Sequence, residues 1–156
     1  MSEQRSQPEW WFYHLQRTSL EQAIGPLLTK CLSRDWRVLV LSGDADRRDA
    51  VDQALWTYED DSFLPHGQAE AAGLDAAEQP VLIAAKADNQ NRADVALLLD
   101  GFELPANAAF SRCMVMFDDG DNSARQMARQ QYKKAKENSL VARYFQQSES
   151  GWSETG

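Results

Sequence analysis

Apolar runs alternate with helix-like segments along most of the chain, and this alternation limits the possible folds more than any other feature. The run Trp36–Leu41 (WRVLVL) is interrupted only by Arg37, which is typical of a strand covered on both faces. The strand-like runs are Trp10–Leu15, Trp36–Leu41, Pro80–Ala85, Ala93–Leu99, Ser111–Phe117 and Leu140–Gln146. The pattern predicts an α/β fold: a single Rossmann-like, three-layer domain with a mostly parallel sheet and right-handed crossovers.

Helix signals stand between several of these runs. Thr18 and Glu21 have the spacing of a capping box at the start of the first helix. Asp44 is a suitable N-cap for the second helix. The third helix is expected over Ser123–Glu137, with a capping box between its first residue and Gln126. These signals place one helix after each of three strands.

The 156 residues fit one domain with a core large enough to be stable alone. We place this domain at 9–147, with flexible polar ends at 1–8 and 148–156. The segment Gln68–Gln79 is rich in Ala, Gly and Glu and has no clear period, so a long loop is expected there.

The cysteines and the apolar runs indicate the compartment. Cys31 and Cys113 fit no metal-ligand spacing and are expected to be buried thiols. No apolar run approaches the roughly 20 residues of a membrane span, and the N-terminus has no signal-peptide core. A reducing, cytoplasmic location without membrane contact is expected.

The net charge of −8 argues against a surface that binds nucleic acid as a whole. The glycine loops that cradle phosphate are also missing, since neither GxGxxG nor GxxxxGK[ST] occurs. We therefore expect no nucleotide cofactor, no metal and no catalytic residue, and only indirect contact with DNA.

Asp118, Asp119 and Asp121 form an acidic cluster after the fifth strand-like run. Carboxylates at the end of a strand could hold Mg²⁺, which makes a metal-dependent phosphoryl-transfer or nucleotide enzyme the alternative function. The same residues also suit a turn followed by a helix N-terminus, where acids are favoured by the helix dipole. Both interpretations stay open from the sequence.

The third predicted helix carries an unusual face. Arg125, Arg129, Tyr132 and Lys136 fall within an arc of about 60° on a helical projection. A solvated basic face is the ordinary interpretation, but an aromatic ring among cations also offers an apolar contact beside positive charge. Such a face suits an acidic peptide better than a DNA duplex.

Five stretches of the chain form a recognisable set: Phe12-Tyr13-His14-Leu15, Trp36-Arg37-Val38-Leu39, Asp52-Gln53-Ala54-Leu55-Trp56, Ser62-Phe63-Leu64-Pro65-His66 and Arg125–Lys133 (RQMARQQYK). Together they resemble the chi subunit of bacterial DNA polymerase III holoenzyme. The ALW and SFLPH stretches at this spacing are specific, and the similarity covers most of residues 10–147.

The resemblance implies a non-catalytic clamp-loader accessory subunit. It would bind the acidic C-terminal tail of single-stranded-DNA-binding protein and so tether the polymerase to coated template. In many bacteria the family also binds the psi subunit, so psi and other clamp-loader subunits are expected partners.

The implied tail-binding residues come from the matching positions. Arg125, Arg129 and Lys133 would receive the tail's carboxylates, and Tyr132 is the ring beside them. Trp56 and Phe63 would form or support the pocket for the terminal phenylalanine; the alternative is that both are core residues. Asp118 and Asp119 depart from the family pattern, in which this place is often apolar, and would repel an acidic tail if they faced the pocket.

Overall fold

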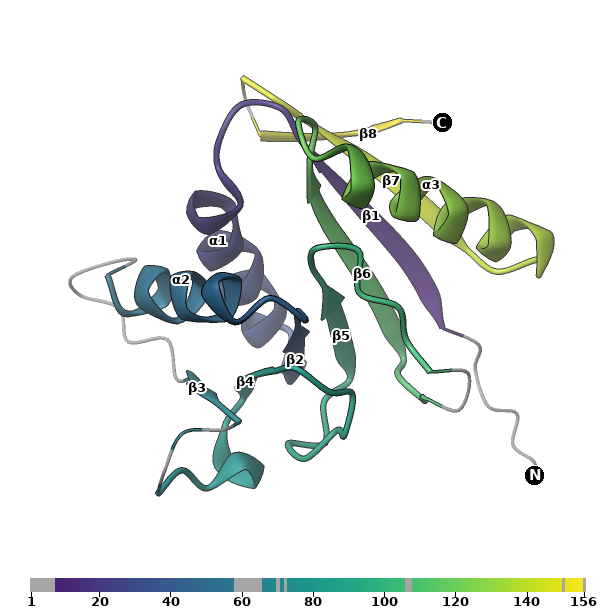
Figure 1. Ribbon diagram of the computed structural model, residues 1–156. Helices are drawn as coiled ribbons and strands as arrows, with labels where there is room; N and C mark the ends of the chain where they lie inside the picture. The colour runs from purple at the N-terminus through teal and green to yellow at the C-terminus, as the bar shows by residue number, and fades with distance from the viewer. Residues whose placement is uncertain are drawn as a thin grey trace, which may run out of the picture.

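The computed structural model describes residues 8–57, 66–69, 71, 73–105, 108–149 and 151–155. These residues form one eight-stranded sheet with helices packed on both of its faces (Figure 1). The strands are β1 (Glu9–Leu15), β2 (Val38–Leu41), β3 (His66–Gln68), β4 (Val81–Ala84), β5 (Val95–Leu98), β6 (Arg112–Asp118), β7 (Ala142–Ser148) and β8 (Gly151–Thr155). The helices are α1 (Leu20–Ser33), α2 (Ala45–Trp56), the short η1 (Ala76–Glu78) and α3 (Asn122–Glu137).

The spatial strand order is β3-β4-β2-β5-β6-β1-β7-β8. Each neighbouring pair is parallel except the terminal hairpin of β7 and β8. The expected α/β fold with a mostly parallel sheet is therefore confirmed. The first strand in sequence lies deep in the sheet, between β6 and β7, with His14 opposite Phe117 on one side and Gln146 on the other.

The strands are apolar on both faces, which is why they read as nearly continuous apolar runs. On β1, Trp11 and Tyr13 pack toward α1 and α2, whereas Phe12 packs toward α3. Two helices thus cover one face and a single helix covers the other (Figure 1). Cys31 and Cys113 are buried free thiols, one in each core, as expected from the sequence.

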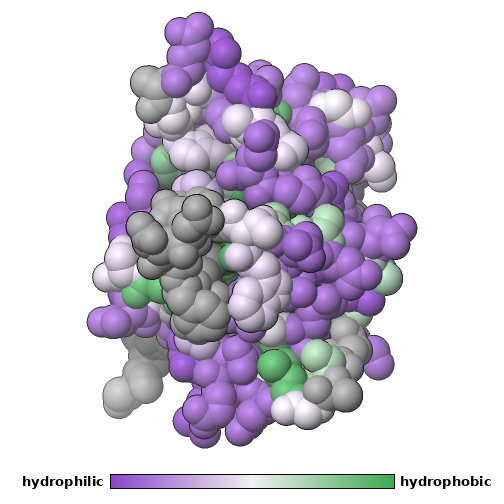
Figure 2. Space-filling model, turned by 90° about the vertical axis from the view of Figure 1, so that its left-hand side faces the viewer, coloured by the Kyte–Doolittle hydropathy of each residue, from purple (hydrophilic) through white to green (hydrophobic). Residues whose placement is uncertain are grey.

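The outer surface on the α2 side is mostly hydrophilic, and its apolar residues form small, separate patches (Figure 2). None of the helices in the described ranges is long and apolar enough to cross a membrane.

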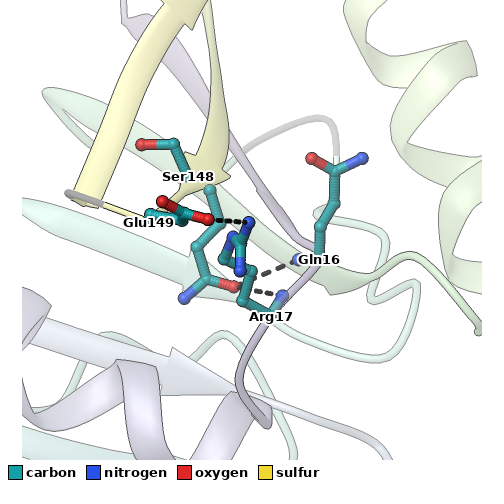
Figure 3. Close-up of a pocket in the computed structure, with 5 residues that line it drawn as sticks. Gln16, Arg17, Ser148 and Glu149 are labelled. Atoms are coloured by element: carbon teal, nitrogen blue, oxygen red, sulfur yellow. Dashed lines mark hydrogen bonds and ion pairs between the residues drawn. The ribbon is translucent and has the colours of Figure 1, made fainter.

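The turn between β1 and α1 is held by a side chain from β7. The Gln147 amide oxygen accepts hydrogen bonds from three consecutive backbone N–H groups, those of Gln16, Arg17 and Thr18, at 2.7–3.1 Å. Figure 3 shows the first two of these residues beside the C-terminal hairpin. The Gln147 amide nitrogen donates to the Thr18 hydroxyl at 2.8 Å. These bonds connect the first crossover to the C-terminal hairpin.

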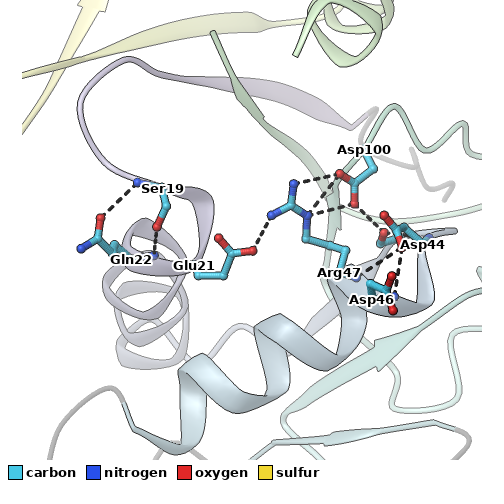
Figure 4. Close-up of polar contacts among 8 residues, drawn as sticks. Ser19, Glu21, Gln22, Asp44, Asp46, Arg47 and Asp100 are labelled. Carbon is cyan, nitrogen blue, oxygen red and sulfur yellow. Dashed lines mark hydrogen bonds and ion pairs between the residues drawn. The ribbon is translucent and has the colours of Figure 1, made fainter. Parts of the chain in front are cut away.

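An ion-pair network joins α1 to α2 (Figure 4). Arg47 on α2 binds Glu21 on α1 and Asp100 after β5, with Nη2 of Arg47 at 3.2 Å from Asp100. Ser42 donates to the same Asp100 carboxylate at 2.6 Å. Since the three ion-paired side chains are only about 18–31% exposed, the network fixes the two helices against the sheet.

The N-terminal caps of the three helices differ from two of the predictions and confirm the third. The capping box of α1 is formed by Ser19 and Gln22, one residue later than Thr18 and Glu21. Asp44 caps α2 as predicted. Asp121 caps α3 by accepting from the backbone N–H of Ala124, so the expected box of Ser123 and Gln126 is wrong. An Asp at the preceding turn reaches the first free N–H groups without a partner residue at N3.

Short elements were missed at both edges of the sheet. Part of Gln68–Gln79, expected to be a loop, belongs to β3 and to η1. Residues in 148–156, expected to be flexible, include β8, which pairs with β7 from Tyr144↔Thr155 to Ser148↔Gly151. The three residues of β3 carry too little periodicity to be recognised in sequence, and the last three residues of β8 are exposed and polar. Of the predicted N-terminal segment 1–8, only Pro8 lies within the described residues.

Candidate functional site

Helix α3 packs closely on the sheet because its buried face is made of alanines, Ala124, Ala128 and Ala135. The flank next to this buried face carries Arg125, Arg129 and Tyr132. Arg125 is partly buried and Arg129 is exposed. The predicted cationic face therefore stands at the margin of the sheet, above β1 and β7.

A cavity of about 280 Å³ opens between α3 and the sheet. Its lining residues are His14, Phe117, Arg125, Arg129, Tyr132, Tyr144 and Thr155. We call it the α3 cavity. Three of the six predicted tail-binding residues, Arg125, Arg129 and Tyr132, line it together.

Aromatic rings form its wall. Tyr132 meets Tyr144 edge to face at a centroid distance of 6.0 Å and meets the buried Phe12 at 5.5 Å. His14 stacks on Phe117 at 4.7 Å. Such edge-to-face packing holds the rings rigidly and leaves an apolar surface beside the guanidinium groups.

A chain of polar contacts crosses the cavity. The Tyr144 hydroxyl lies 2.8 Å from Nδ1 of His14, and Nε2 of His14 lies 2.7 Å from Asp119. When Nε2 carries the proton and donates to Asp119, Nδ1 accepts from Tyr144. Arg125 approaches the same Asp119 oxygen at 3.5 Å. The hydrogen bond from His14, with further help from Arg125, holds the pKa of Asp119 below its usual value.

Arg129 differs from Arg125 in having no carboxylate within ion-pair distance among the described residues. It lies near Tyr144: burial raises the pKa of that phenol, while Arg129 acts in the opposite direction. Lys136 places its ammonium 5.8 Å from the Tyr132 ring centroid. Lys133 is exposed and does not line the cavity. Arg129 is therefore the cation at this cavity most open to an incoming anion.

The structure does not bring Trp56 to this cavity. Trp56 ends α2 on the other side of the sheet, where it is 59% exposed and contacts His66 edge to face at 5.1 Å. The core alternative does not describe it either, because its side chain lies at the surface. Phe63 lies outside the described residues.

Sequence reasoning missed His14, Phe117, Tyr144 and Thr155 as lining residues. A signal was present in the period of two along β1, which places His14 on the same face as Phe12. That signal becomes useful only once the strand order is known. Only the finished sheet shows that β7 and β6 flank β1 and bring Tyr144 and Phe117 to His14.

Comparison with known proteins identifies the family of the chain. A family model described as "DNA polymerase III chi subunit, HolC" matches residues 8–143. The chain belongs to this family. This match confirms the resemblance noted in the sequence. Chi is an accessory subunit in DNA replication.

One curated protein similar to this chi-family chain is the "Probable DNA polymerase III subunit chi" of Rickettsia prowazekii (strain Madrid E). The two are 29% identical over 87 residues, which cover 56% of this chain and 52% of the relative. The chain thus spans about half the length of the curated relative in this match.

In this chi-family chain a side chain occupies the position after the first strand where α/β folds often bind phosphate. Backbone N–H groups after the first strand of such folds commonly point at a bound anion. Here the three N–H groups that converge after β1 are bound to the Gln147 amide oxygen. A phosphate could reach them only by displacing a side chain that also bonds Thr18.

The acidic cluster is engaged in local bonds. Asp118 accepts from the backbone N–H of Gly120 at 3.0 Å, and Asp121 caps α3. Asp119 binds His14 and Arg125. Within the described ranges, no group of three or more His, Cys, Asp or Glu side chains is placed to hold a metal ion. The geometry of this part of the chain gives the metal-dependent alternative no support.

Proposed function

We propose that this chi-family chain is a non-catalytic subunit of the DNA polymerase III clamp-loader complex that binds the acidic C-terminal tail of single-stranded-DNA-binding protein in the α3 cavity. The observation that carries the proposal is Arg129, whose guanidinium pairs with no carboxylate of the described chain and borders an aromatic-walled cavity of about 280 Å³. By holding the tail, the subunit would tether the polymerase to coated template.

The cavity offers one feature for each part of such a tail. A guanidinium can receive a terminal carboxylate through two parallel hydrogen bonds, which favours Arg129 as its partner. The rings of Tyr132, Tyr144 and Phe117 offer a surface for the terminal phenylalanine side chain. Lys133 and Lys136, exposed on the same helix, would attract the preceding aspartates.

Asp119 has a double effect in this proposal. Its charge opposes an acidic ligand, as its place in the sequence suggests. However, its contacts with His14 and Arg125 hold both side chains in place. Arg125 is then partly committed, which leaves Arg129 as the main carboxylate partner.

The test is a titration of the purified chain with an acidic peptide that ends in Pro-Phe, as the free acid and as the C-terminal amide. Because charged hydrogen bonds contribute roughly 1.5–3 kcal/mol, the amide should bind about 10- to 150-fold more weakly. Equal affinity for the two peptides would show that the cavity does not recognise a terminal carboxylate. It would overturn the assignment of the α3 cavity as the tail-binding site.

We also propose contacts with other clamp-loader subunits, psi among them, through surfaces outside the α3 cavity. Since Arg129 is confined to the cavity rim, the variant Arg129→Ala should co-purify with those subunits as the wild type does while losing tail binding. Loss of both associations together would contradict separate surfaces.

A further inference from the structure

A second cavity, of about 300 Å³, opens on the opposite face of the sheet, beside α1. We call it the α1 cavity. Five aromatic rings line it: Trp11, Tyr13, Trp36, Phe145 and Trp152. They form a continuous cluster, in which Tyr13 stacks on Phe145 at 5.1 Å and Trp11 meets Trp36 edge to face at 6.1 Å.

Guanidinium groups lie over these rings. Arg112 is 4.1 Å from the centroid of Trp36 and 5.1 Å from that of Trp11. Arg34 lies 5.1 Å from Trp36, and Arg143 lies 5.0 Å from Trp11. Each pair is within cation–π range. This cluster of rings and guanidinium groups extends from the core to the surface, because Trp11 is buried and Arg34 is exposed.

The local charge is positive on a chain whose net charge is −8. Lys30, Arg34 and Arg112 have no carboxylate within ion-pair distance among the described residues. Burial raises the pKa of the Cys31 thiol to about 11, and these same three cations act to lower it. Lys30 and Arg34 line the α1 cavity together with Cys31.

Two carboxylates limit the positive patch. Glu154 binds Arg143 through two hydrogen bonds, at 2.8 and 2.9 Å. Glu9 accepts from the Trp11 indole at 3.0 Å. The cations left to meet a ligand are therefore those on the α1 side, Lys30 and Arg34, with Arg112 between the rings.

We propose that the α1 cavity is a binding site for single-stranded nucleic acid, which would take a base against the rings and guanidinium planes while Lys30 and Arg34 bind the adjacent phosphates. Flat bases stack on aromatic rings and on arginine planes, and single strands are commonly bound by this combination with a basic groove. An acidic peptide would bind the cations but would leave the ring surfaces without a flat partner. This inference does not depend on tail binding in the α3 cavity.

The probe is a fluorescent deoxythymidine oligonucleotide of about 15 nucleotides, titrated with the full chain and followed by anisotropy. We expect a Kd on the order of 10⁻⁵ M at physiological salt, weakening as salt rises. A duplex of the same length should bind at least about tenfold more weakly, because its bases cannot enter the cavity. No binding at millimolar protein, or equal binding of the duplex, would overturn the proposal.

Two variants test the two parts of the site. Arg34→Ala should reduce the slope of log K against log salt by about 0.7. Trp36→Leu should weaken binding by roughly 5- to 150-fold, the effect of losing one stacking ring. Lys86→Ala removes an exposed cation after β4, several strands away from the α1 cavity. This control variant should change neither the salt slope nor the affinity for the oligonucleotide. Thermal melting of each variant separates loss of binding from loss of the fold.

Two further probes distinguish the ligand classes. An abasic oligonucleotide of equal length should bind at least about fivefold more weakly than the thymidine strand. Polyglutamate should not displace the strand at equal charge concentration. If the abasic strand binds equally, or if polyglutamate displaces the strand and is itself weakened by Arg34→Ala, the cavity binds anions or acidic peptides and the proposal is wrong.

The tail-peptide titration, run in parallel on the same samples, keeps the two proposals separate. Arg34→Ala should bind the Pro-Phe peptide as the wild type does, and Arg129→Ala should bind the oligonucleotide as the wild type does. Loss of both ligands in either variant would show that the two cavities are not independent sites.

Discussion

The two faces of the sheet use arginine and aromatic residues in different ways. At the α3 cavity, Arg129 borders an aromatic-walled cavity with its side chain exposed to solvent. At the α1 cavity, guanidinium carbons lie over indole rings, at 4.1–5.1 Å from the ring centroids. The first arrangement offers directed donors to an anion, whereas the second offers flat surfaces to a flat partner.

The helices that cover the two faces are also attached to the sheet in different ways. A single helix with three buried alanines covers the α3 face, so its flanks stay available for ligand contacts. On the other face, α1 and α2 are joined to each other and to the sheet through Arg47. The comparison predicts that binding and stability can be disturbed separately.

The largest expected effect is on tail binding by Arg129→Ala. Arg129 lines the cavity and has no carboxylate partner in the described chain. Its removal should weaken binding of the Pro-Phe peptide by about 10- to 150-fold. Folding should change by less than about 0.5 kcal/mol, since the side chain is exposed. Arg129→Lys should recover only part of the loss, because an ammonium keeps the charge without the two-pronged geometry. Titration calorimetry with all three proteins measures these changes, and wild-type affinity in the alanine variant would reject the site.

Arg47→Met tests the opposite face. It leaves the carboxylates of Glu21 and Asp100 without their cation, and we expect unfolding free energy to fall by about 1–3 kcal/mol. That is less than for a fully buried pair because Arg47 is 22% exposed. Urea denaturation measures the change. Peptide affinity of the folded variant should stay within about twofold; a larger change would mean that the two faces are coupled.

Tyr144→Phe should have a smaller effect. It removes the hydroxyl that contacts His14 at 2.8 Å but keeps the ring that meets Tyr132. Losing one hydrogen bond of this kind costs about 0.5–1.5 kcal/mol of stability. Peptide affinity should fall by less than in Arg129→Ala, because the apolar wall remains. If the two variants lose affinity equally, the phenol contacts the peptide directly and the role given to the polar chain is wrong.

The fold and part of the site could be predicted from the sequence, for separate physical reasons. The period of a helix is local, so the pattern of residues alone places Arg125, Arg129 and Tyr132 on one face. The residues opposite them depend on strand order, which is not local: Tyr144 reaches His14 only because β7 pairs with β1. For the same reason Trp56 was grouped with a helix from which the sheet separates it. The strand β8 was missed because its outer residues are polar.

The smallest expected effect belongs to Asp119→Asn, which also has a pH signature. Removing this exposed negative charge should tighten peptide binding by roughly 1.5- to 5-fold, the range for a surface charge. The result would show that Asp119 opposes the ligand. Weaker binding would show instead that its hold on Arg125 and His14 matters more than its charge.

The pH dependence of stability separates these two roles. In the folded chain the pKa of Asp119 is lowered from 3.8, chiefly by the hydrogen bond from His14. A carboxylate whose pKa is lowered on folding stabilises the protein above its unfolded pKa, and this contribution is lost as pH falls through the folded value. Denaturation midpoints measured from about pH 6 to about pH 2.5 should therefore fall less steeply below about pH 4 in Asp119→Asn than in the wild type. Identical curves would mean that the contact between His14 and Asp119 does not stabilise the fold, so that Asp119 acts at the cavity through its charge alone.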